Sequence, residues 1–150
     1  MTMTTTMQSE QITSSGRVPA APTPLRILCV DDEPAIHTIL AKLLGRAGHV
    51  CEMAANGQQA LERVRANPAG FDLVLTDDQM PVMSGLNLVV ALRGMRFAGR
   101  IAVHSSCLST NNRAAYKALG VDVFVDKPTD SIELFRTITE LGDSAPPKTS

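Results

Sequence analysis

The stretch Asp72-Leu73-Val74-Leu75-Thr76-Asp77-Asp78 decides the fold, because an apolar run ends there in two consecutive acids. Two other apolar runs also end in charged residues: residues 25–30 lead into Asp31-Asp32, and residues 121–125 lead into Asp126-Lys127-Pro128. Runs that are apolar at nearly every position are typical of parallel strands covered on both faces. Ligands bind at the carboxyl ends of such strands. We therefore expect several carboxylates and one ammonium group to share a cleft that holds a cation.

Helical periodicity alternates with the apolar runs along the chain, which is typical of a parallel sheet with helices on both faces. The expected strands are 25–30, 50–54, 71–76, 101–104 and 121–125. The expected helices are 34–47, 58–65, 86–96, 111–119 and a last one after Asp130 that reaches Leu141. The fold class is therefore α/β, a doubly wound sheet of five parallel strands.

The first and last helices each carry an apolar stripe that should face the sheet. In the first helix the stripe consists of Ile36, Ile39, Leu40, Leu43, Leu44 and Ala47. In the last helix the stripe consists of Ile132, Phe135, Ile138 and Leu141. Asp130 is the expected N-cap of that helix, with Glu133 three residues on as its capping-box partner.

Length and composition limit the range of functions. The chain has 150 residues, enough for one ordinary domain, and a net charge of −1, which favours neither nucleic acid nor an anionic membrane as a partner. Three scattered cysteines indicate a reducing cytoplasm rather than a disulfide framework. No membrane span or secretory signal is visible. Residues 1–24 and 144–150 are expected to be disordered tails, with one domain over residues 25–143.

Four motifs follow the strand ends in order: Asp31-Asp32, Asp77 ahead of Met80-Pro81, Ser105-Ser106, and Lys127-Pro128. This arrangement resembles the receiver domain of two-component response regulators, the family that includes the chemotaxis regulator. The resemblance runs from about Leu25 to Leu141. It implies a flavodoxin-like strand order of 2-1-3-4-5.

The resemblance also implies a magnesium-dependent phosphorylation site. Asp77 would be the phosphoacceptor and form an aspartyl phosphate. Asp32 and Asp77 would ligate Mg²⁺ directly, Asp31 would hold it mainly through water, and the backbone carbonyl of Gln79 would complete the protein ligands. Oxygen donors of this kind suit Mg²⁺, which screens the repulsion between a carboxylate and a phosphoryl group.

Three further residues take roles by the same resemblance. Lys127 would pair with Asp77 at rest and with a phosphoryl oxygen afterwards. Ser105 would turn toward the phosphoryl group, although Ser106 competes for this role. Phe124 would swing inward with Ser105, although an aromatic residue in an apolar strand is as readily explained as plain core. The movement would change the face formed by the fourth helix, the fifth strand and the fifth helix.

The first functional hypothesis is therefore a stand-alone signalling module. It would accept phosphate from a sensor histidine kinase or a histidine phosphotransfer protein, and an unidentified protein would dock on the switching face. It would catalyse only its own phosphorylation and dephosphorylation, so we do not expect an enzyme with a separate substrate. Neither nucleic acid nor membrane is an expected direct partner.

Two other classes of protein remain as alternatives. A phosphatase of the haloacid dehalogenase kind also uses a Mg²⁺-bound aspartate, but it needs an acid two residues after the nucleophile, where Gln79 stands. A flavodoxin-like carrier needs a phosphate-binding loop after the first strand, where Asp31-Asp32-Glu33-Pro34 would repel a phosphate.

Asp78 departs most clearly from the usual family pattern, because this position is often apolar. Alternation at the strand end favours a side chain that points away from the cleft and pairs with a neighbour. His104 is interpreted as a hydrogen-bonded strand residue rather than a functional one. The resemblance further implies a cis peptide bond between Lys127 and Pro128.

Overall fold

The protein folds around one parallel sheet whose five strands lie in the order β2-β1-β3-β4-β5. The structure is a computed structural model and describes residues 23–127 and 131–144. The order confirms the predicted doubly wound topology. The two central pairings place Val30 beside Thr76, and Thr76 beside Val103, so the carboxyl ends of β1, β3 and β4 reach the same edge.

Strands and helices alternate along the chain as the sequence predicts. The strands are β1 (Arg26–Val30), β2 (Val50–Ala54), β3 (Leu73–Thr76), β4 (Arg100–Ser105) and β5 (Val123–Asp126). The helices are α1 (Pro34–Arg46), α2 (Gly57–Ala66), α3 (Gly85–Gly94), α4 (Thr110–Ala118) and α5 (Ser131–Ser144). Most predicted boundaries differ from these by one or two residues.

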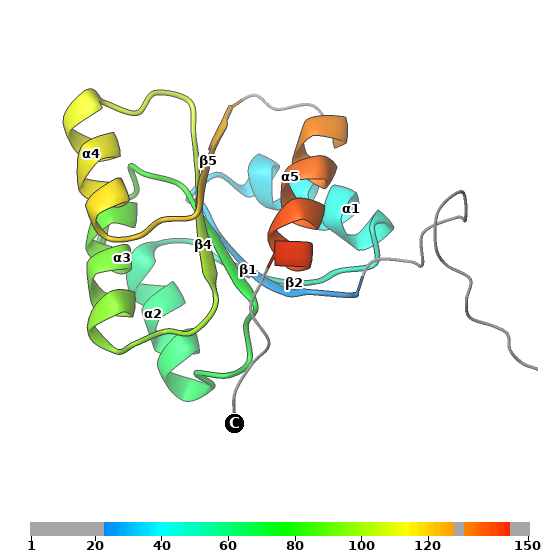
Figure 1. The fold of residues 1–150 in the computed structure, drawn as a ribbon, viewed down its shortest axis with the longest axis horizontal. Helices are drawn as coiled ribbons and strands as arrows, with labels where there is room; N and C mark the ends of the chain where they lie inside the picture. The colour runs from blue at the N-terminus through cyan, green and yellow to red at the C-terminus, as the bar shows by residue number, and fades with distance from the viewer. Residues whose placement is uncertain (1–22, 128–130, 145–150) are drawn as a thin grey trace, which may run out of the picture.

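Helices cover both faces of the sheet, with α2, α3 and α4 on one side and α1 and α5 on the other (Figure 1). Each side has its own apolar core. On the α2–α4 side the core includes Leu28, Val74 and Val103, and on the α1–α5 side it includes Ile27, Leu75 and Ala102. Because alternate residues of each strand point to opposite faces, nearly every strand position is apolar.

Three helices begin at side chains that cap them. Asn56, Ser84 and Ser109 each accept a hydrogen bond from the backbone N–H three residues on, at the start of α2, α3 and α4. These bonds satisfy N–H groups that have no partner within the helix. Helix α1 instead begins at Pro34, whose ring fixes φ for the first turn. The caps fix where each helix leaves the edge of the sheet that carries the acids.

Two predicted core positions are wrong. Ile39 in α1 is 50% exposed and Ile132 in α5 is 67% exposed, whereas Leu134, which the predicted stripe omits, is fully buried. Both exposed residues stand at the margins of their stripes, where helical periodicity alone does not decide between core and solvent. The stripe of α5 is thus rotated from Ile132 toward Leu134, and Ile138 remains buried as predicted.

Some predictions fall on residues outside the described ranges. These are the Asp130 cap, the Lys127–Pro128 peptide bond, residues 1–22 of the predicted N-terminal tail and residues 145–150 of the C-terminal one. Within the described ranges, none of the helices has both the length and the apolar character needed to cross a membrane. Cys29, Cys51 and Cys107 are free thiols.

Candidate functional site

Three carboxylates meet at the carboxyl edge of the sheet. Asp31 and Asp32 follow β1, Asp77 follows β3, and one oxygen from each lies within 4.8 Å of the others. Asp31 is buried, Asp77 is half-buried and Asp32 is exposed, so the group opens toward solvent. Mg²⁺ binds carboxylate oxygens and keeps several waters. Three converging carboxylates with an open side therefore fit this cation.

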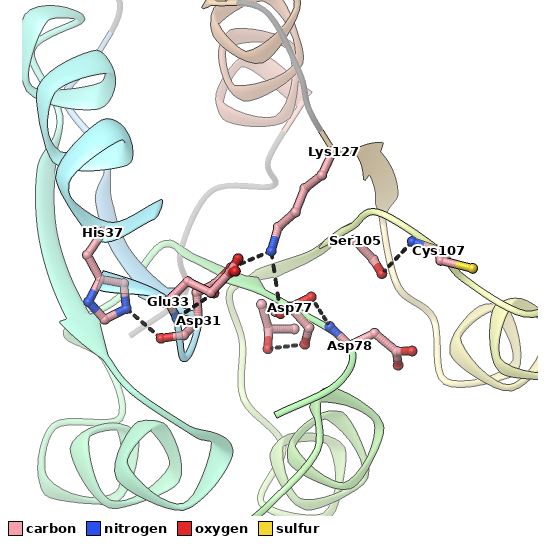
Figure 2. Close-up of polar contacts among 9 residues, drawn as sticks. Asp31, Glu33, His37, Asp77, Asp78, Ser105, Cys107 and Lys127 are labelled. Atoms are coloured by element: carbon pink, nitrogen blue, oxygen red, sulfur yellow. Dashed lines mark hydrogen bonds and ion pairs between the residues drawn. The ribbon is translucent and has the colours of Figure 1, made fainter. Parts of the chain in front are cut away.

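Lys127, from the end of β5, points into this acidic group (Figure 2). Its Nζ lies 2.6 Å from Oδ2 of Asp31 and 3.4 Å from Oδ2 of Asp77. The predicted pairing with Asp77 is therefore present, but the shorter contact is to Asp31. Asp31 is the most buried of the acids and has the greatest need of a partner charge.

The pKa values of Lys127 and Asp77 reflect this crowding. Burial by itself would lower the pKa of Lys127, but its bond to Asp31 and the charges of Asp77 and Asp31 outweigh burial and raise it. Burial raises the pKa of Asp77, and the Lys127 charge offsets part of that rise. A raised pKa marks a more basic carboxylate oxygen, which is the better nucleophile once ionised.

The backbone around the acids is held by local hydrogen bonds. Oδ1 of Asp31 accepts from the N–H of Glu33 at 2.9 Å, and the Asp31 carbonyl oxygen lies 2.6 Å from Nε2 of His37 on α1. Oδ1 of Asp77 accepts from the N–H of Asp78 at 2.8 Å. One oxygen of each of these two carboxylates is thus fixed by its own loop, while the other faces Lys127.

Asp32, Asp77 and Lys127 line a cleft of about 680 Å³. Its polar wall includes Asp32, Asp77, Gln79, Ser105 and Lys127. Its apolar wall comes from α1 and α5 and includes Ile36, Ile39, Leu40, Leu43 and Leu134. The exposed Ile39 therefore borders the cleft rather than the core. An acidic site beside an apolar wall suits a charged group delivered by a larger partner.

The described contacts of Ser105 and Phe124 are with residues other than Asp77. The hydroxyl oxygen of Ser105 accepts from the N–H of Cys107 at 3.4 Å, and Ser106 is exposed beside it. The Phe124 ring meets Tyr116 edge-on, with ring centroids 6.2 Å apart, and the Arg113 guanidinium lies 4.5 Å from the Phe124 centroid. Phe124 is thus held by α4, and only a change in these contacts would let it move.

His104 is buried in the wall of the same cleft, beside Ser105. Its Nε2 has no hydrogen-bond partner among the described residues, so the predicted hydrogen-bonded strand histidine is wrong on this point. Burial, together with the nearby Lys127 charge, lowers the pKa of His104 to about 4, although the Asp31 charge acts in the opposite direction. The ring is neutral at physiological pH.

Asp78 points away from the cleft, as predicted, and pairs with a neighbour. Its side chain is 2% exposed and its Oδ1 accepts from the Tyr116 hydroxyl at 2.5 Å. The Asn112 amide lies 3.3 Å from Oδ2 and 3.5 Å from Oδ1. We call Asp78, Asn112 and Tyr116 the Asp78 cluster.

Sequence reasoning missed the two members of this cluster that lie on α4. Tyr116 is the only tyrosine of the chain and is fully buried. A buried tyrosine hydroxyl needs a hydrogen-bond partner, which is a signal of polar pairing but does not identify the partner. Asp78 lies 38 residues away in the sequence, so only the fold joins the two.

The comparisons with known proteins all point to the same family. Residues 27–139 match the family model described as the response regulator receiver domain. The chain is 37% identical over 113 residues to the two-component response regulator ORR41 of Oryza sativa subsp. japonica, covering 73% of this chain and 88% of that protein. It is 29% identical over 121 residues to the two-component response regulator ARR22 of Arabidopsis thaliana, covering 80% and 85%.

Solved structures agree. The chemotaxis protein CheY4 of Vibrio cholerae superposes with a TM-score of 0.73 at 29% identity, covering 79% of this chain and 99% of that one. A CheY-like receiver domain protein from Methanospirillum hungatei JF-1 gives a TM-score of 0.77 at 27% identity, covering 82% and 97%.

Proposed function

The chain belongs to the family of response regulator receiver domains of two-component signalling, and on that premise we propose that Asp77 accepts a phosphoryl group from a phosphohistidine with the help of Mg²⁺. One observation carries the proposal. Carboxylate oxygens of Asp31, Asp32 and Asp77 converge within 4.8 Å and face Lys127 in an open cleft. The donor would be a sensor histidine kinase or a histidine phosphotransfer protein.

The transfer is a single displacement at phosphorus. The free carboxylate oxygen of Asp77 attacks, the new O–P bond forms as the N–P bond breaks, and the leaving imidazole nitrogen keeps the electron pair and takes a proton from solvent. When bound by Asp31, Asp32, Asp77 and the Gln79 carbonyl, Mg²⁺ supplies positive charge against the repulsion between the two anions. The catalytic work of this chain is positioning and charge stabilisation.

Lys127 supplies the chain's own positive charge to the reaction. Its Nζ lies near both Asp31 and Asp77, so a small shift of the ammonium brings it to a phosphoryl oxygen on Asp77. Charge-assisted hydrogen bonds of this kind are short and strong. Later attack by water on the acyl phosphate releases inorganic phosphate and restores the carboxylate. The chain turns over no separate substrate in this scheme.

The signal leaves through the face formed by α4, β5 and α5. The Ser105 hydroxyl turns from the Cys107 N–H to donate to a phosphoryl oxygen, and Phe124 moves into the space that Ser105 leaves. Phe124 then gives up its contacts with Arg113 and Tyr116, which changes the surface of α4. An unidentified downstream protein reads that change.

We also propose that the chain acts in the cytoplasm. Three cysteines that remain free thiols fit a reducing compartment.

The test is incubation with acetyl phosphate and Mg²⁺, followed by intact mass. We expect one labile acyl phosphate per chain in the wild type and none after Asp77→Asn, with Asp78→Asn as the matched control that keeps the label. Chelation of Mg²⁺ should stop labelling. Steady release of inorganic phosphate from an unrelated phosphomonoester would favour the haloacid dehalogenase class instead. Labelling that survives in Asp77→Asn would contradict the proposal.

A further inference from the structure

Two consecutive acids at the end of β3 lie in opposite surroundings. Asp77 borders the cleft, whereas the Asp78 side chain points away from Lys127 and Asp31 (Figure 2). Asp78 carries a carboxylate that is 2% exposed and directly follows the phosphoacceptor. A charge that close to the phosphoryl site lies well inside the Debye length of about 8 Å at physiological salt.

Helix α4 supplies the donors that hold this carboxylate in place. The Tyr116 hydroxyl lies 2.5 Å from Oδ1, and the Asn112 amide lies 3.3 Å from Oδ2. Burial, together with the bond to Asp78, raises the pKa of Tyr116 well above its ordinary value, so the hydroxyl keeps its proton and remains a donor. A buried carboxylate without such donors is costly.

The loop between β3 and α3 is shaped to admit the Tyr116 hydroxyl. A Cβ atom at Gly85 would lie 2.9 Å from the Tyr116 hydroxyl oxygen and would clash with the Asp77 carbonyl oxygen. The Gly85 N–H donates to the Asp78 carbonyl at 2.8 Å, so the loop closes directly over Asp77 and Asp78. The phosphoacceptor loop and α4 are therefore in direct contact at this point.

We propose that Tyr116 and Asn112 are positioning residues of the phosphoryl site, which hold the Asp78 carboxylate outside the cleft so that Asp77 can take up a cation and a phosphoryl group without a competing acid. This inference rests on the proposed function of Asp77. It concerns residues of α4 that touch neither the cation ligands nor Lys127 in the described contacts.

A consequence is that the docking of α4 and the charge on Asp77 are linked. When α4 moves away, Asp78 loses its hydrogen-bond donors, and the negative charge of Asp78 then disfavours the added phosphoryl group. By thermodynamic reciprocity, phosphorylation of Asp77 then favours the docked position of α4. This link runs through Asp78 and is separate from the movement of Ser105 and Phe124.

The deciding experiment measures the affinity for beryllofluoride, a phosphoryl analogue, at saturating Mg²⁺ in four proteins: wild type, Tyr116→Phe, Asp78→Asn and the double variant. Phenylalanine keeps the ring that packs against Phe124 and removes only the hydroxyl. We expect Tyr116→Phe to weaken binding about three- to tenfold, because only part of the free energy of a hydrogen bond to a charged group is transmitted to the phosphoryl site. Asp78→Asn alone should change binding less than about threefold.

The double variant distinguishes a positioning role of the Tyr116 hydroxyl from a merely structural one. With no charge at position 78, the hydroxyl is no longer needed, so the double variant should bind beryllofluoride within about twofold of Asp78→Asn. Wild-type affinity in Tyr116→Phe would overturn the inference. A loss that Asp78→Asn fails to rescue would also overturn it, because the effect would then come from packing.

A second pair of variants covers the case in which Tyr116→Phe does not fold. Asn112→Ala should weaken binding in the same direction, by about twofold since its contacts are longer, while Asn111→Ala, at an exposed position on the same helix, should not. Equal affinities in this pair and wild type would overturn the role of Asn112. If the wild type binds no beryllofluoride, both the proposed function and this inference are overturned. A result confined to one of the variants bears on this inference alone.

Discussion

Asp77 and Asp78 are adjacent and chemically identical, yet the fold gives them opposite tasks. Asp77 is half-buried in an open cleft with two other carboxylates and an ammonium group, an arrangement that leaves one oxygen available for chemistry. Asp78 is buried and held by neutral donors from α4. The two side chains point to different sides of the sheet edge at the end of β3. This direction, and not the residue type, decides whether an acid can react.

Among the described residues that line the cleft, Lys127 supplies the ammonium group, so the largest expected effect on stability comes from Lys127→Met. This change leaves the buried Asp31 carboxylate without its closest partner, which should lower the free energy of unfolding by about 3 kcal/mol. Urea unfolding at neutral pH measures it. Lys117→Met, at an exposed lysine of α4, is the control that should stay near wild type. Equal stability of the two variants would mean that Asp31 is compensated by other groups.

The second change acts on the acids themselves. Asp32→Ala removes one proposed cation ligand and should slow acetyl phosphate labelling about a hundredfold, by analogy with loss of one preorganised electrostatic group. In the absence of divalent cations it should raise the free energy of unfolding, because repulsion among the carboxylates falls. The two readouts move in opposite directions. Unfolding curves that show a loss of stability instead would contradict the crowded-charge account of the cleft.

The third prediction concerns pH. The folded protein keeps His104 neutral down to about pH 4, whereas the unfolded chain binds a proton on this ring near pH 6.5. Stability from this residue is therefore complete above pH 6.5 and is lost as the pH falls toward 4, by up to about 3 kcal/mol. His104→Leu should flatten the stability profile across that window relative to wild type. Parallel profiles for the two proteins would show that His104 is paired in solution.

The smallest expected effect belongs to Asp78. Asp78→Asn should change the phosphorylation and dephosphorylation rates less than about threefold, which corresponds to under about 0.7 kcal/mol. Its bond to Tyr116 lies outside the cleft, and asparagine keeps an acceptor oxygen for the hydroxyl. Rates come from label formation and decay by intact mass. A tenfold change in either rate would place Asp78 within the reacting site.

Much of this arrangement could be predicted because it follows from strand ends. Alternating runs predicted the five strands and helices, and the parallel order brings Asp31, Asp77 and Lys127 to one edge although Lys127 lies 96 residues from Asp31. The direction of Asp78 also followed from alternation along the strand.

The rest depends on packing that no local pattern contains. The exposure of Ile39 and Ile132 depends on how each helix is rotated over the sheet. The contact between Tyr116 and Asp78 depends on how closely α4 approaches the loop between β3 and α3, and Gly85 permits that approach. The short bond from Lys127 to Asp31 depends on relative burial, which the sequence does not state.

The central claim is that Asp77, and not its neighbour, carries the phosphoryl group. The most direct measurement treats the wild type with acetyl phosphate and Mg²⁺, reduces the acyl phosphate with borohydride, and locates the resulting homoserine by peptide fragmentation. The account predicts homoserine at position 77, with aspartate retained at positions 31, 32 and 78. Homoserine at position 78, or at none of these positions in a protein that had taken up the label, would contradict it.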